Sequence, residues 1–225
     1  MAIGQNLRVS AKVFRASMAV AIPVGFYGAA FGAASISAGL DLLQTIALSS
    51  ILFSGASQFA IVGVIGSGGG VLAAILASAL LGIRNGFYAL RMAPLLETSG
   101  FKRLVAAHIT IDEATAVALA QDQSDRASVR KGFWFTGIGV FIFWNLFTII
   151  GALSASTLED PAKWGLDSAV PAAFLALLWP QLTDKRLRII ALLAMMMALA
   201  LSPLLTAGLP IIAVVIIALI AGWKR

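Results

Sequence analysis

The stretch ILFSGASQFAIVG, Ile51 to Gly63, lies in the middle of a run from Leu42 to Ile83 that contains no charged residue. This run is much longer than the roughly 20 apolar residues that one membrane-spanning helix needs. Three further charge-free runs extend over Ala16–Leu40, Gly132–Leu158 and Ile189–Trp223. The chain is therefore predicted to be an all-α polytopic membrane protein.

The composition supports this class. Of the 225 residues, 60% are hydrophobic and 12% are charged, against about 25% charged residues in a soluble domain. The mean hydropathy is +0.96. An outer-membrane barrel would alternate apolar and polar residues in short segments, and the charge-free runs do not alternate.

Several functions are disfavoured by the same composition. The chain has no cysteine and one histidine, so neither a thiol site nor a histidine cluster for a metal is expected. No nucleotide-binding motif occurs, and we expect no cofactor and no enzymatic activity. The net charge of +6 comes from Lys and Arg at the edges of apolar runs, which is typical of cytoplasmic loops. Nucleic-acid binding is therefore not expected, and lipid is the expected surrounding.

About seven to eight transmembrane helices fit the chain, some of them broken by Gly or Pro. The cluster Gly66–Gly70 is expected to divide the long second run, and Ser202–Pro210 to form a hairpin in the last one. The Lys/Arg bias places both termini in the cytoplasm, which requires an even number of crossings. His108–Gln121 is the candidate for the eighth crossing, although this arrangement leaves Lys102 and Arg103 outside. The alternative is a short helix or a re-entrant segment there.

A faint internal repeat is present. The tripeptide GLD occurs at Gly39–Asp41 and again at Gly165–Asp167, each time after a basic cluster and one apolar span. Many secondary transporters consist of two repeats whose broken helices form the substrate site. We interpret the chain as one membrane domain, 1–225, with possible repeats at 8–121 and 126–225.

The polar residues of the opening stretch are the first candidates for a binding site: Ser54, Gly55, Ser57 and Gln58. Small residues often serve helix packing, which is the simpler explanation. An unpaired Gln amide in hydrocarbon, however, costs several kcal/mol. An unwound turn at Ser54–Ala56 would also free backbone groups that could bind a carboxylate or an ammonium.

The segment PVGFYGAAFG, Pro23 to Gly32, contributes Pro23, Gly25 and Gly28 to the same predicted site. Gly28 and Gly32 form a GxxxG pattern, which commonly packs helices together. A kinked helix packed through these glycines and a cavity opened by the kink are both compatible with the pattern.

Charged and amide residues complete the candidate set. Arg84 and Asn85 lie late in an apolar span, where snorkelling to the interface is the alternative role of the arginine. Asp112 and Glu113 are adjacent acids in an apolar segment, and such pairs are usually functional. One could pair with Arg84 and the other could take up a proton, since burial raises the pKa of a carboxylate. A capping turn is the alternative for this pair, and Asp167 is a secondary candidate with the same alternative.

These stretches together resemble the AzlC-type family, the large subunit of the two-component branched-chain amino acid exporters. The resemblance rests on PVGFYGAAFG, GASQFA, RNGFYALRMAP, IDEATA and GLDSAVPAAFLALL, which occur in this order from Pro23 onward. Ala114 and Thr115 follow the acidic pair, where a Thr and then a bulky residue are expected in many relatives.

The resemblance implies a secondary active exporter of branched-chain amino acids in the bacterial inner membrane. It implies coupling to the proton gradient or the membrane potential, and a small hydrophobic partner subunit, AzlD-like, in the membrane. Two other functions are compatible with the residues alone: a scaffold subunit for a transporting partner, and a small-solute channel.

Overall fold

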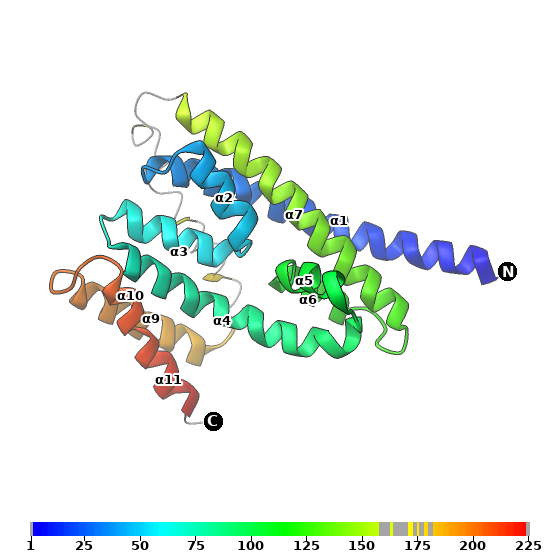
Figure 1. Cartoon of the computed structure of the whole chain (residues 1–225). Helices are drawn as coiled ribbons and strands as arrows, with labels where there is room; N and C mark the ends of the chain where they lie inside the picture. The colour runs from blue at the N-terminus through cyan, green and yellow to red at the C-terminus, as the bar shows by residue number, and fades with distance from the viewer. Residues whose placement is uncertain are drawn as a thin grey trace.

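The computed structural model describes residues 2–157, 163, 171–172, 175, 178–179 and 182–223. All regular structure in this part of the chain is helical, which confirms the all-α class (Figure 1). The larger helices are α1 (Ala2–Ser37), α2 (Leu42–Leu52), α3 (Gly55–Gly66), α4 (Val71–Leu96), α5 (Gly100–His108), α6 (Asp112–Leu119), α7 (Arg126–Ser156), α9 (Lys185–Leu201), α10 (Leu209–Ala213) and α11 (Val215–Trp223).

Three of these helices are long and apolar enough to cross a membrane: α1 from Val9 onward, α4 and α7. Two of them, α1 and α7, lie side by side along most of their length (Figure 1). They run in the same direction, because Phe14 contacts Phe135 and Phe26 contacts Phe147 at the same offset in sequence. This parallel pair is the axis around which the other elements pack.

Glycines bring α1 and α7 into close contact. A Cβ atom on Gly32 would lie 2.1 Å from the carbonyl oxygen of Thr148, and one on Gly25 would lie 2.4 Å from the Cβ of Phe143. Gly28 is equally close to the α7 backbone. The GxxxG pattern therefore packs helices, as small residues do in membranes. Gly25 and Gly28 thus pack against α7 and do not line the pocket described below, and their predicted role in substrate binding stays a prediction.

The first part of the second apolar run, residues 42–66, forms a hairpin whose two ends lie at the same end of the bundle. Asp41 caps the first turn of α2, with its carboxylate accepting from the Gln44 amide at 2.8 Å. The chain breaks after α2 at Phe53, whose ring lies 5.0 Å from that of Phe141 near the middle of α7. It then turns back as α3, and a Cβ on Gly66 would lie 3.2 Å from the Cβ of Ala38. Both ends of the hairpin therefore lie beside the end of α1.

A second hairpin enters from the opposite end. The end of α4 lies beside the start of α7, where Arg130 donates to the Leu95 carbonyl at 3.1 Å. From there α5 runs back toward the middle of α7, and the ring of His108 lies 5.7 Å from that of Phe141. After a turn at residues 109–111, α6 returns along α7. The two hairpin tips thus meet at the same level.

These hairpins correct two topological predictions. Residues 42–66 were expected to cross once, and 108–121 were expected to supply an eighth crossing. The eight residues of α6 extend only about 12 Å, whereas the hydrocarbon core is about 30 Å thick. The short-helix alternative is therefore the one that the structure contains. The eight-span arrangement placed Lys102 and Arg103 outside. In the structure they belong to the first turn of α5, at the end of the bundle where α4 finishes and α7 begins.

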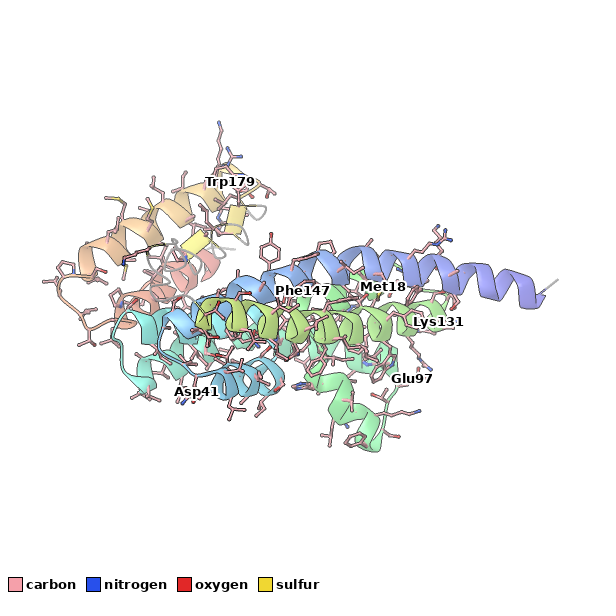
Figure 2. All side chains as sticks on the ribbon, turned by 90° about the horizontal axis from the view of Figure 1, so that it is seen from above. Met18, Asp41, Glu97, Lys131, Phe147 and Trp179 are labelled. Carbon is pink, nitrogen blue, oxygen red and sulfur yellow. The ribbon has the colours of Figure 1, made fainter. Side chains whose placement is uncertain are left out.

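The side chains mark the two ends of the bundle. Figure 2 shows Glu97 and Lys131 at the end where α4 finishes and α7 begins, and Asp41 at the opposite end. Apart from Arg84, the Lys and Arg residues of the described segment 9–157 belong to the first of these ends or its connecting loops. Within residues 9–157, the bundle therefore has a basic end, where α4 finishes and α7 begins, and an opposite end without Lys or Arg.

The C-terminal helices pack on the outside of this core. Ser202–Pro210 contains the turn between α9 and α10, as expected. A Cβ on Gly208 would lie 2.9 Å from Val64 and 3.0 Å from Ala73, so the turn rests on α3 and α4. The second GLD copy and its associated break lie outside the described residues, and the two-repeat organisation stays a prediction.

Candidate functional site

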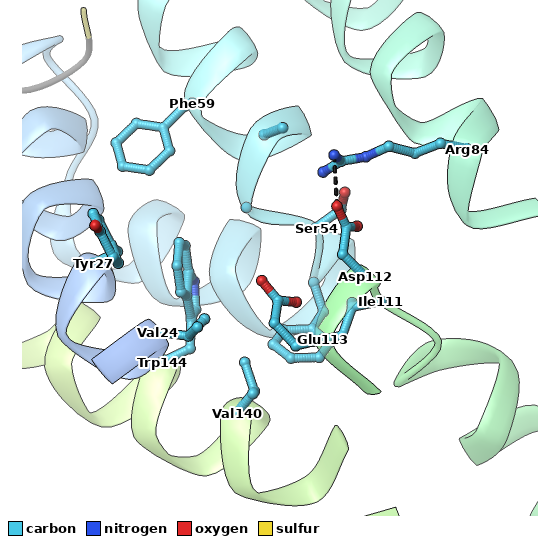
Figure 3. Close-up of a pocket in the computed structure, with 13 residues that line it drawn as sticks. Val24, Tyr27, Ser54, Phe59, Arg84, Ile111, Asp112, Glu113, Val140 and Trp144 are labelled. Atoms are coloured by element: carbon cyan, nitrogen blue, oxygen red, sulfur yellow. Dashed lines mark ion pairs between the residues drawn. The ribbon is translucent and has the colours of Figure 1, made fainter. Parts of the chain in front are cut away.

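A pocket lies where the two hairpin tips meet, between α1, α4 and α7 (Figure 3). Its cavity volume is about 90 Å³, which is room for on the order of six to nine water molecules. That is the scale of one small solute. Its lining residues are Val24, Tyr27, Phe53, Ser54, Gly55, Ala56, Phe59, Arg84, Ile111, Asp112, Glu113, Val140 and Trp144.

The break between α2 and α3 forms one wall of the pocket. Phe53 has a φ of 21°, in a region that residues other than glycine rarely adopt, and Ser54 is extended as the N-cap of α3. The Ser54 side chain does not cap the helix; its hydroxyl donates to Ser57 at 3.2 Å. The first amides of a helix lack intrahelical acceptors. The helix is interrupted at Phe53 and Ser54, slightly before the predicted unwound turn at Ser54–Ala56, because Gly55 and Ala56 already form the first turn of α3. Both residues line the pocket wall.

Gln58 explains why an amide occurs in this apolar stretch. Its side chain is fully buried, and its Nε2 donates to the carbonyl oxygens of Ser49 at 3.0 Å and Leu48 at 3.3 Å. The last carbonyls of a helix have no intrahelical partners, and Ser49 is in the last turn of α2. Gln58 thus satisfies the end of α2 and ties it to α3. It does not line the pocket, and its predicted contact with a substrate stays a prediction.

The charged wall comes from α4 and α6. Arg84 forms an ion pair with Asp112, with 2.7 Å between Nη1 and Oδ2, as one of the two acids was predicted to do. Figure 3 shows this pair on one side of the pocket, with the Glu113 carboxyl pointing into the space beside it. Among the described residues Glu113 has no ion-pair partner. Two adjacent acids therefore have different surroundings: one is matched by a cation and the other is not.

Three further predicted residues do not line the pocket. Pro23 is exposed on α1, although its neighbour Val24 lines the cavity. Ser57 is buried and donates to the Ser78 carbonyl at 3.0 Å, joining α3 to α4. Asn85 is half-buried beside Arg84 without lining the pocket. The placement of these three residues in the pocket is therefore wrong, and Asp167 lies outside the described residues.

The sequence analysis missed the residues that α1 and α7 supply. Trp144 and Val140 line the pocket from the middle of α7, and Tyr27 lines it from α1. A tryptophan in the middle of a charge-free span is a detectable signal, because its indole N–H needs an acceptor when buried. The predicted residues that do meet in the pocket are Ser54, Gly55, Arg84, Asp112 and Glu113.

Comparisons with known proteins place this sequence in a family. The family model described as AzlC protein matches residues 19–158, which include both hairpins and every residue of the pocket. The chain belongs to the AzlC family. Within the AzlC family, it is 29% identical over 169 residues to an uncharacterized membrane protein of Archaeoglobus fulgidus, covering 74% of this chain and 72% of that protein.

A second AzlC-family relative is the inner membrane protein YgaZ of Escherichia coli, 30% identical over 164 residues. That match covers 70% of this chain and 65% of YgaZ, so the chain spans slightly less than two thirds of that relative. No solved structure matches the chain. The family is associated with membrane transport, and the matched range contains the pocket residues.

Proposed function

We propose that this AzlC-family protein exports branched-chain and other small apolar amino acids across the bacterial inner membrane. The observation that supports this best is the composition of the pocket. Its lining contains hydrogen-bond donors, two acids and apolar side chains, with Arg84 paired to Asp112 and Glu113 beside that pair. A free amino acid with an apolar side chain has the same three chemical parts.

The polar walls suit a zwitterion. An ammonium group can donate to Glu113 and Asp112, and a carboxylate can accept from Arg84 and from the first amides of α3. A helix N-terminus favours negative charge. Binding pockets of this kind typically combine an apolar lining with a few placed polar groups. The cavity volume of about 90 Å³ excludes a large solute in this conformation.

The apolar walls suit a short branched side chain. Val24, Phe59 and Val140 line the cavity from three different helices. Phe59 is 1% exposed and Val140 is 2% exposed, so both are fixed by the surrounding core. Burying an apolar side chain against such a wall stabilises the complex by roughly 25 cal/mol per Å² of apolar surface removed from solvent.

Coupling to protons follows from the unequal surroundings of the two acids. A zwitterionic leucine has no net charge, so the membrane potential alone does not drive it outward. The charge of Asp112 is matched by Arg84. Glu113 has no ion-pair partner among the described residues, and removal of a carboxylate from water favours its protonated form. We therefore assign proton uptake to Glu113, with Asp112 as the second choice.

The two hairpins suggest how the pocket opens in turn to each side. Each tip closes the pocket from one end of the bundle, and a helix break is a place where the backbone can rearrange at low cost. The Lys/Arg-rich end fits the cytoplasmic side. This orientation puts the N-terminus, the loop 122–125 and the start of α9 in the cytoplasm, together with the C-terminus.

A small hydrophobic membrane subunit, AzlD-like, is the proposed partner. The described part of α9 has no buried residue, and α4 exposes Phe87 and Leu90. Lipid or a partner helix can cover both faces. Two alternative functions are a scaffold for a transporting partner and a channel for small solutes.

Flux of labelled leucine in proteoliposomes tests the proposal. Efflux is measured under an imposed pH gradient or potential, with the chain alone and with its partner subunit. We expect saturable, gradient-driven leucine efflux that Asp112→Asn reduces and Glu97→Gln, an acid outside the pocket, leaves unchanged. Flux that does not saturate would indicate a channel, and flux that needs only the partner would indicate a scaffold. No leucine flux in any combination would refute the proposal.

A further inference from the structure

Trp144 has a buried donor that faces the pocket. The residue is 5% exposed, it lines the cavity, and its Nε1 has no hydrogen-bond partner among the described residues. The indole N–H can only donate. A buried donor without an acceptor destabilises a protein, so such an atom in a pocket points to an acceptor that arrives with a ligand.

The direction of this donor is fixed by packing. The ring stacks on Phe31 with 6.2 Å between centroids and meets the edge of Phe59 at 6.3 Å. On a third side, a Cβ atom on Gly55 would lie 3.1 Å from the Cη2 of Trp144. Figure 3 shows the ring nitrogen on the side of the ring where Glu113 lies, across the cavity. The N–H is therefore held toward the open space.

The same contact puts the ring beside the start of α3. Gly55 and Ala56 are the first two residues of that helix and line the cavity. Their amides belong to the set that has no intrahelical acceptor. Two independent kinds of donor, the indole N–H and the first turn of α3, thus border one part of the pocket, and the carboxyl of Glu113 lies on the other side.

We propose that Trp144 binds the carboxylate of the substrate through Nε1–H, together with the first-turn amides of α3. This role rests on the proposed amino acid export. Trp144 is then the residue that selects for a free carboxylate, while Glu113 receives the ammonium end. The site accepts amino acids and discriminates against amines of the same shape.

Binding of two ligands to matched variants tests this role. L-leucine is compared with isoamylamine, which has the same apolar chain and ammonium but no carboxylate. Trp144→Phe keeps an aromatic ring and removes the N–H. Trp134→Phe is the control, because Trp134 lies on the same helix and lines a different groove. Kd is measured by calorimetry on the full chain in nanodiscs.

We expect Trp144→Phe to raise the Kd of leucine about ten- to a hundredfold, the range for a hydrogen bond to a charged group. The Kd of isoamylamine should change less than threefold, and Trp134→Phe should change neither value. An unchanged Kd of leucine would overturn the proposal. An equal rise for both ligands would also overturn it, because Trp144 would then act through the pocket's shape or through Glu113.

A measurement on the unmutated protein covers the case in which Trp144→Phe does not fold. With ¹⁵N-labelled tryptophan, the five indole N–H groups give separate NMR signals. Leucine should shift one of them downfield, and isoamylamine should not. Leucine binding with no such shift would overturn the role of Trp144 alone. Absence of leucine binding to the wild-type protein would instead refute the proposed function.

Discussion

Replacing Gln58 by Leu should destabilise the protein through the end of α2. The side chain is fully buried and donates to two carbonyl oxygens, at 3.0 Å and 3.3 Å. Leu has a similar size and cannot donate. The change therefore leaves the carbonyls of Ser49 and Leu48 without this donor, in a place that water does not reach.

The magnitude follows from the cost of buried acceptors. Each carbonyl left unsatisfied costs about 1–3 kcal/mol, and the Leu48 carbonyl is also in a position to accept within α2. A total loss of about 2–4 kcal/mol is expected. For a domain of this size, 1 kcal/mol corresponds to about 2–4 °C in melting temperature, so Gln58→Leu should melt roughly 4–16 °C lower.

The assay is thermal unfolding in nanodiscs, combined with leucine flux on the same preparation. Gln121→Leu is the matched control, because Gln121 makes a similar bond to the Val117 carbonyl at 2.9 Å but is only half-buried. The control should lose less than about 1 kcal/mol. An unchanged melting temperature for Gln58→Leu, with flux abolished, would refute the structural role and return Gln58 to the binding site.

Three further predictions concern coupling, topology and pH. Glu113→Gln should abolish uphill, pH-driven leucine efflux and leave exchange partly intact, because the amide can neither take up nor release a proton; full pH-driven efflux would contradict the proton role. Single cysteines at Gly68 and Lys102, in a chain that has none, should react with an impermeant maleimide from the periplasmic and the cytoplasmic face respectively; the reverse assignment, which one crossing by residues 42–66 would give, would contradict the hairpins. Hydrogen bonds from Ser128 lower the pKa of Asp125 below its ordinary value. The Asp125 carboxylate therefore stabilises the start of α7 fully above its unfolded pKa of about 3.9. This stabilisation is lost as the pH falls through the lower pKa of the folded state. The difference in melting temperature between wild type and Asp125→Ala should therefore shrink between pH 7 and pH 3, and a constant difference would contradict the capping role.

The sequence by itself determined the class of the protein and several local features. Charge-free runs report how the chain partitions between water and lipid, which depends on composition alone. A helix break close to Ser54 and Gly55 was also predictable, because Ser and Gly have low helix propensity and act locally; the structure has it at Phe53 and Ser54. The pairing of Arg84 with Asp112 was predictable, since isolated charges in an apolar setting need partners.

The tertiary structure alone decided where the chain goes after each break. Together α2 and α3 contain 23 residues, about 35 Å of helix, which is long enough to cross the membrane or to fold back within it. Hydropathy has the same value in both cases. The contacts of Gly66 with Ala38 and of Phe53 with Phe141 select the hairpin. For the same reason the sequence alone could not assign roles to Gln58 and Trp144. Gln58 joins α3 to the end of α2, and Trp144 lines the pocket. Both roles depend on which helices lie beside these residues, and contacts throughout the fold decide that.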